Sequence, residues 1–141
     1  MKFIQLIIFL MFFSFNCLSQ FYEKKTYKIQ RINNSIKIDG QLNEKQWSNL
    51  PLAKNFVQIN PNNGKKERDT QKTEVKICYN DQSIFFGVVM YDNAPDSILK
   101  ELSKRDVENK NFDAFNIFID PFNNGQVEYN FTVTAAGVQI D

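Results

Sequence analysis

The feature that most constrains the fold of this chain is a series of short segments in which apolar and polar residues alternate. Turns rich in Asn, Asp and Gly separate these segments, and such turns favour antiparallel hairpins. A period of two places successive side chains on opposite faces of a β-strand. We therefore expect strands at residues 36–38, 55–59, 73–79, 84–91, 114–120, 128–134 and from 138 onward. The pattern predicts an all-β fold, an antiparallel, jelly-roll-like β-sandwich with one or two short helices.

Two short helices are expected at residues 44–49 and 97–104. Asn43 can cap the first helix, and Pro51 ends it. The segment at 84–91 is almost continuously apolar, which is typical of a strand central in its sheet. Side chains expected to face inward on the last two long strands are Phe115, Ile117, Ile119, Tyr129, Phe131 and Val133.

Residues 1–19 have the features of a secretory signal peptide. Lys2 precedes an apolar run at 3–15, and small residues occupy the positions that a signal peptidase reads. A membrane span needs roughly 20 apolar residues, so this run is too short. An alternative is a lipoprotein signal with a lipidated Cys17. We expect an exported protein, in the periplasm, at the outer membrane or outside the cell, with no membrane span after cleavage.

The charge and composition exclude several functions. The formal net charge is only +1, so no basic excess indicates nucleic acid as a partner. The chain has no histidine, which excludes Ser-His and Cys-His nucleophile pairs and His-based zinc sites. Cys78 is expected to be a half-buried strand residue. No catalytic residue is predicted within this chain.

The stretch "IKIDGQLNEKQW" contains the chain's single tryptophan, Trp47. Asp39 and Gly40 are expected to form a turn, and Glu44 to sit in the first turn of the following helix. Trp47 is a sugar platform or a core anchor; we favour the core anchor, with its indole N–H hydrogen-bonded. Asp39 and Glu44 could also be a catalytic carboxylate pair, but nothing in the sequence places them across a cleft.

Six segments, in this order, resemble the family 9 carbohydrate-binding module. They are "IDGQLNEKQW", "NPNNGK", "TEVKICYNDQSIFFGVVMYD", "KRD", "DAFNIFID" and "YNFTVTAAGVQID". The resemblance is closest to the version at the N-terminus of large exported Bacteroidetes proteins, where it precedes an uncharacterised C-terminal domain. It covers residues 32–141, and residues 20–31 form an N-terminal lead-in. It implies a β-sandwich and carbohydrate binding in proteins often involved in glycan breakdown.

The resemblance also implies where a sugar would bind. Lys110 stands where well-understood members carry a stacking Trp, Asn116 where they carry a Glu, and Thr132 where they carry an Arg. From the residues themselves, Phe118 and Asn130 share a predicted strand face with Asn116 and Thr132. An aromatic ring can stack on the apolar face of a sugar, and amides can bind its hydroxyls. Arg105 is a further candidate.

Four acids at predicted strand ends could supply oxygen ligands for a structural Ca²⁺, which some family members carry. No dense calcium-loop motif accompanies them, so no cofactor is expected and calcium stays an alternative. These acids are Asp92, Asp106, Asp113 and Asp120.

Three functions follow as hypotheses. The first is a carbohydrate-binding-like accessory module of a larger exported protein, linked to glycan catabolism. The second is a sandwich with a degenerate sugar site that docks on the protein's own downstream C-terminal domain or on another protein. The third is the N-terminal fragment of a glycoside hydrolase that acts on O-glycosyl bonds. Because the last predicted strand has barely begun at Asp141, we expect a C-terminally truncated piece of a longer protein.

Overall fold

The structure is a computed structural model that describes residues 25–107 and 111–141. The predicted signal peptide, including Cys17, lies outside the described residues. So does Lys110, one of the sugar-site candidates.

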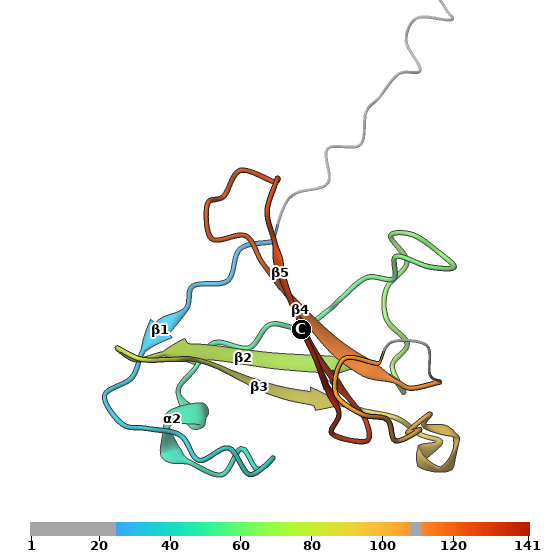
Figure 1. The fold of residues 1–141 in the computed structure, drawn as a ribbon. Helices are drawn as coiled ribbons and strands as arrows, with labels where there is room; N and C mark the ends of the chain where they lie inside the picture. Colours follow the sequence, from blue (N-terminus) through green and yellow to red (C-terminus); the bar gives the residue numbers. More distant parts are fainter. Residues whose placement is uncertain (1–24, 108–110) are drawn as a thin grey trace, which may run out of the picture. The chain divides into compact units, whose positions relative to one another are not determined.

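The described residues form two three-stranded sheets (Figure 1). The first has the order β1-β2-β3, from β1 (Gln30–Arg31), β2 (Thr73–Tyr79) and β3 (Ile84–Met90). The second has the order β4-β5-β6, from β4 (Ala114–Ile119), β5 (Tyr129–Thr134) and β6 (Gln139–Ile140). Helical structure in the described part is short, namely α2 (Lys45–Ser48) and the 3₁₀ turn η2 (Pro95–Ser97). The all-β prediction is confirmed.

The chain divides into two compact units, which are described separately. Of the described residues, one unit comprises 25–51 with Ile77–Phe85, and the other comprises Leu52–Lys76 with 86–107 and 111–141. Each of β2 and β3 contributes residues to both units.

The first unit has its core around Trp47, whose side chain is only 3% exposed. Ile32, Ile36, Leu50 and Cys78 complete this buried cluster, and a partly buried Phe85 packs against it. Cys78 is fully buried rather than half-buried, and burial raises the pKa of its thiol.

Glu44 ties two segments of this unit to the tryptophan. One carboxylate oxygen accepts the indole N–H of Trp47 at 3.1 Å, and the other accepts the backbone N–H of Lys37, also at 3.1 Å. Glu44 also occupies the N-cap position of α2, where we expected Asn43. Its carboxylate makes no cap bond, because these two donors already engage it.

A parallel strand pair corrects the prediction of wholly antiparallel pairing. In β1, Gln30 lies opposite Cys78 and Arg31 opposite Tyr79, in parallel register with β2. The Nη2 group of Arg31 also donates to both oxygens of the Asp81 carboxylate, at 2.6 and 2.7 Å. A strand of two residues is too short to show a period, so it was assigned to the lead-in.

Three predicted elements are absent, and one predicted strand has a different position in its sheet. Residues 36–38 form no strand, and residues 55–59 contribute only the isolated bridge of Val57 with Lys66. The predicted helix at 97–104 is wrong, because Leu99 exchanges backbone and carboxylate hydrogen bonds with Asp113 instead. The segment at 84–91 was expected to be a central strand. Instead, β3 lies at an edge of its sheet, and β2 is the central strand.

In the second unit, β5 pairs antiparallel with both β4 and β6, as predicted. The predicted inward face of β5 is wrong, since Phe131 and Val133 are 43% and 49% exposed while Thr132 and Thr134 are buried. Tyr129, the third residue predicted to be inward, is exposed as well. The two threonine hydroxyls tolerate burial because each is hydrogen-bonded within the unit.

Candidate functional site

The antiparallel register brings four of the predicted sugar-site residues onto one face of the β4–β5 hairpin. Asn116 lies directly opposite Thr132, and Phe118 lies directly opposite Asn130. Residues two apart in a strand share a face, so the two pairs are neighbours. We call these four residues the sheet-face cluster.

One pair of this cluster is largely engaged with itself. The Thr132 hydroxyl donates to the side-chain oxygen of Asn116 at 2.5 Å, and Thr132 is only 5% exposed. A buried hydroxyl in a short hydrogen bond is not available to a ligand. Asn116 is exposed, however, and its amide NH₂ group retains donors that this bond does not use.

The other pair is open to solvent. Phe118 is 60% exposed, and Asn130 beside it is exposed as well. The cluster therefore presents one aromatic ring next to two side-chain amides. An apolar sugar face can lie on such a ring while the amides bind its hydroxyl rim.

Arg105 binds side chains outside the sheet-face cluster. It forms an ion pair with Asp141 at 2.5 Å and a longer one with the Asp106 carboxylate at 3.6 Å. It also reaches the side chain of Gln139 in β6 at 3.4 Å. The hydrogen bond with Asp141 raises the pKa of Arg105 further above its usual value. These contacts fasten the loop before β4 to the end of β6 and do not join Arg105 to the sheet-face cluster.

The residues of the "IKIDGQLNEKQW" stretch occupy structural positions. Asp39 accepts the backbone N–H of Gln41 at 3.0 Å and forms an ion pair with Lys37 at 3.2 Å. Gly40 has a φ of 78°, a left-handed conformation that glycine adopts without strain. The carboxylates of Asp39 and Glu44 are therefore each engaged with nearby backbone and side-chain groups.

The four strand-end acids each serve a different turn or loop. The Asp92 carboxylate accepts the backbone N–H of Ala94, and the Asp113 carboxylate accepts the backbone N–H of Leu99. The Asp106 carboxylate accepts the backbone N–H of Asp141. The Asp120 carboxylate accepts the backbone N–H groups of Phe122 and Gly125. Within residues 25–107 and 111–141, no three His, Cys, Asp or Glu side chains come together as a metal site would require.

Asp120 anchors the loop between β4 and β5 through hydrogen bonds to its backbone. Its carboxylate accepts the N–H of Gly125 at 2.8 Å and that of Phe122 at 3.0 Å, and the Gly125 bond chiefly lowers the pKa of Asp120. A carboxyl whose pKa is lowered by folding stabilises the loop above its unfolded pKa, and this contribution is lost as pH falls through the folded value.

Because the folded-state pKa is lowered, we expect the Gly125 amide resonance to shift only at pH values below the ordinary pKa of an Asp carboxyl. The variant Asp120→Asn should show no such titration, because its side chain carries no ionisable proton. A Gly125 resonance that titrates equally in both proteins would contradict this role.

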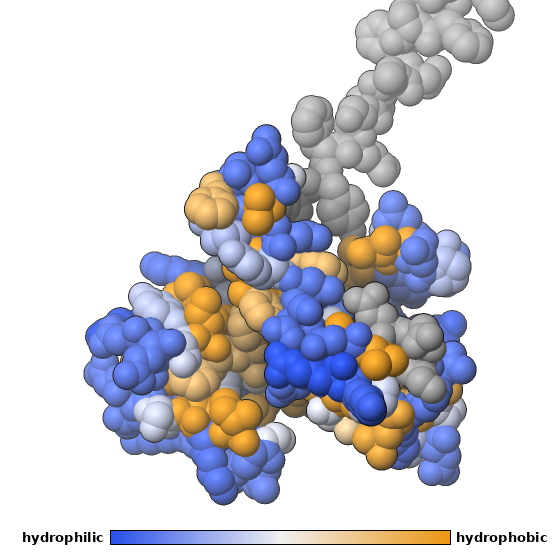
Figure 2. Space-filling view, in the orientation of Figure 1, coloured by the Kyte–Doolittle hydropathy of each residue, from blue (hydrophilic) through white to orange (hydrophobic). Residues whose placement is uncertain are grey.

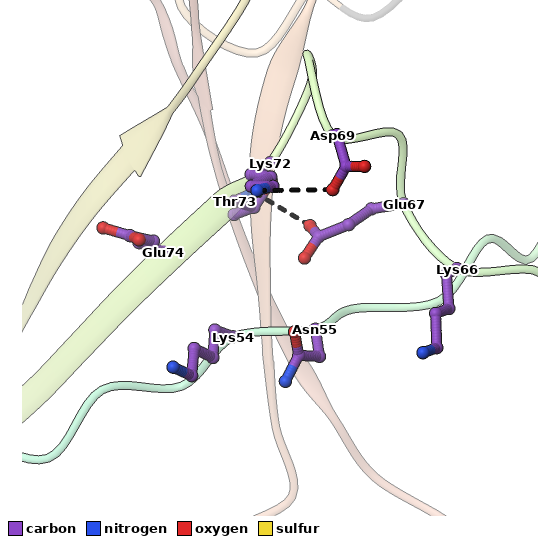
Figure 3. A pocket seen from close by; sticks show the side chains of 8 residues that line it. All are labelled: Lys54, Asn55, Lys66, Glu67, Asp69, Lys72, Thr73 and Glu74. Carbon is purple, nitrogen blue, oxygen red and sulfur yellow. Dashed lines mark hydrogen bonds and ion pairs between the residues drawn. The ribbon is translucent and has the colours of Figure 1, made fainter.

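The structure also contains a polar hollow that the sequence did not reveal (Figure 3). Its volume is 310 Å³. It lies entirely in the second unit, where the segment after Pro51 runs beside the start of β2. Its lining residues are Lys54, Asn55, Lys66, Glu67, Asp69, Lys72, Thr73 and Glu74.

Glu67 holds the walls of this hollow together. One carboxylate oxygen accepts the N–H of Thr73 at 2.9 Å, and the other accepts the N–H of Phe56 at 3.2 Å. A hollow built by two distant segments leaves no period or spacing in a sequence.

No helix in the described residues is long and apolar enough to cross a membrane. Comparison with family models, with curated proteins and with solved structures found no match.

Proposed function

We propose that this chain is a carbohydrate-binding-like accessory module of a larger exported protein and is not itself a catalyst. In this proposal, its two sheets belong to a β-sandwich of the kind that the sequence resemblance implies. Export to the periplasm, the outer membrane or the cell exterior depends on the signal-like residues 1–19. The parent protein would act in glycan catabolism.

The observation that supports sugar binding most strongly is the exposed Phe118 beside Asn116 and Asn130. Aromatic rings supply apolar area at a low entropic cost, and amides both donate and accept hydrogen bonds. The binding surface would be smaller than that of the family members it resembles, because Thr132 is buried and Arg105 is ion-paired. Weak, millimolar-range affinity is therefore expected.

A saccharide screen tests this function. The folded chain is titrated with mono- and oligosaccharides of several classes, and binding is followed by calorimetry and by NMR. We expect weak saturable binding to at least one class. A folded chain that binds no saccharide would overturn the proposal.

A second candidate, a docking module, is favoured by a separate observation. Tyr129, Phe131 and Val133 lie on the other face of β5 and are all exposed. The space-filling view also shows hydrophobic residues exposed between hydrophilic ones on the surface (Figure 2). Apolar faces of this kind are characteristic of protein interaction sites. In this candidate, the face packs against the proposed downstream C-terminal domain.

The double variant Phe131→Ser, Val133→Ser tests the docking face. We expect the unaltered chain to bind a hydrophobic reporter dye and to self-associate at high concentration. The variant should lose at least half of the dye fluorescence while keeping its saccharide binding. Unchanged dye binding in a folded variant would count against a docking role for this face.

A further inference from the structure

The charges that line the polar hollow are not equally neutralised. The Glu67 carboxylate is held by two backbone N–H groups, and the Asp69 carboxylate forms an ion pair with Lys72 at 3.3 Å. Glu74 accepts a hydrogen bond from the Tyr91 hydroxyl at 3.2 Å. Each acid in the hollow therefore already has a donor within the chain.

Two cations of the hollow differ from these acids. Throughout residues 25–107 and 111–141, no ion-pair or hydrogen-bond partner is found for the ammonium groups of Lys54 and Lys66. In the close-up view, both lysines and the Asn55 side chain extend to the same side of the segments that carry them (Figure 3). The carboxylate of Glu67 turns instead toward Thr73.

We propose that this hollow binds a carboxylate-bearing sugar, a uronic acid unit of a glycan. Lys54 and Lys66 would bind the carboxylate as charge-assisted donors, with Asn55 beside them. Sugar hydroxyls would donate to Glu67 and Glu74, whose oxygens each have lone pairs beyond those already used. The 310 Å³ volume is at the lower end of the range typical of small-molecule sites.

The mixture of charges favours this ligand over simpler ones. A bare inorganic anion would use the lysines but would lack the several hydroxyl donors that the carboxylates of Glu67 and Glu74 can accept. A neutral sugar would use the carboxylates but not the ammonium groups of Lys54 and Lys66. A uronic acid supplies one negative group for Lys54 and Lys66, and it supplies several hydroxyl donors for Glu67 and Glu74. This site goes beyond the proposed function, because it uses none of the residues of the sheet-face cluster.

The test compares glucuronate and galacturonate oligosaccharides with their methyl esters, which have the same shape without the charge. The variant Lys54→Gln, Lys66→Gln should bind the acidic oligosaccharides about tenfold more weakly than the unaltered chain at low salt. The matched control Lys100→Gln, Lys104→Gln removes the same net charge from lysines outside the hollow and should bind them as the unaltered chain does.

Several results would overturn this inference. Equal binding of the acids and their methyl esters would remove the role of the charge. An equal loss in the control variant would show a general effect of net charge, and equally tight competition by inorganic phosphate would remove the role of the sugar. The outcome is independent of the sheet-face cluster, because Phe118→Ala should leave binding of the acidic oligosaccharides unchanged.

Discussion

Replacing Trp47 with alanine is expected to lower the free energy of unfolding by about 3–5 kcal/mol, the usual range for a large buried aromatic side chain. Trp47 fills the centre of the cluster formed by Ile32, Ile36, Leu50 and Cys78, and its removal leaves a cavity there. The change also leaves the Glu44 carboxylate without the indole N–H that it accepts. Because small domains are only marginally stable, this variant should be largely unfolded at 37 °C.

Urea denaturation followed by circular dichroism measures this loss. Leu102→Ala is the matched control, because Leu102 is 75% exposed and its truncation should change the stability by less than about 0.5 kcal/mol. Trp47→Phe separates packing from the hydrogen bond, since it keeps a ring and removes the N–H. Equal stabilities of Trp47→Ala and Leu102→Ala would show that this cluster is not the core of its unit.

Replacing Phe118 with alanine is expected to weaken the binding of neutral saccharides at the sheet-face cluster about tenfold or more. Covering an aromatic side chain contributes about 1.5–3 kcal/mol, and every 1.4 kcal/mol is tenfold in affinity. The folded state should be little affected, because Phe118 is mostly exposed before any ligand binds. The loss should therefore appear in Kd and not in the denaturation midpoint.

Phe122→Ala is the control for this variant. Phe122 is also a largely exposed phenylalanine, but it lies in the loop after β4 and belongs to none of the cross-strand pairs of the sheet-face cluster. Its truncation should leave the affinity within about twofold of the unaltered chain, the scale of a surface substitution. Equal losses in the two variants would mean that binding depends on exposed aromatic area in general.

The long strands could be predicted from the sequence, because apolar and polar residues alternate along them with the period of a strand. β2 matches residues 73–79, and β4 and β5 fall within the predicted ranges. The elements that were missed depend on distant partners. β1 exists through its pairing with β2, and residues 97–104 lose their helix because Leu99 bonds to Asp113, fourteen positions away.

The candidate site was predictable in part. Strand periodicity placed Asn116, Phe118, Asn130 and Thr132 on one face, and the register agrees with this. Alternation defines two faces but does not say which of them the rest of the chain covers, so the burial of Thr132 and the exposure of Phe131 were not foreseen. The hollow around Glu67 is made by two segments brought together in three dimensions, and it could not be predicted from spacing.

The most direct test of carbohydrate binding at the sheet-face cluster uses the side-chain amide resonances of Asn116 and Asn130. In ¹H–¹⁵N spectra recorded during titration with the best neutral saccharide of the screen, both NH₂ groups should shift in parallel with the binding curve. In Phe118→Ala, these shifts should require about tenfold more saccharide to reach the same extent. Saturable binding that leaves both amides unmoved would contradict the account and would place the sugar elsewhere on the protein.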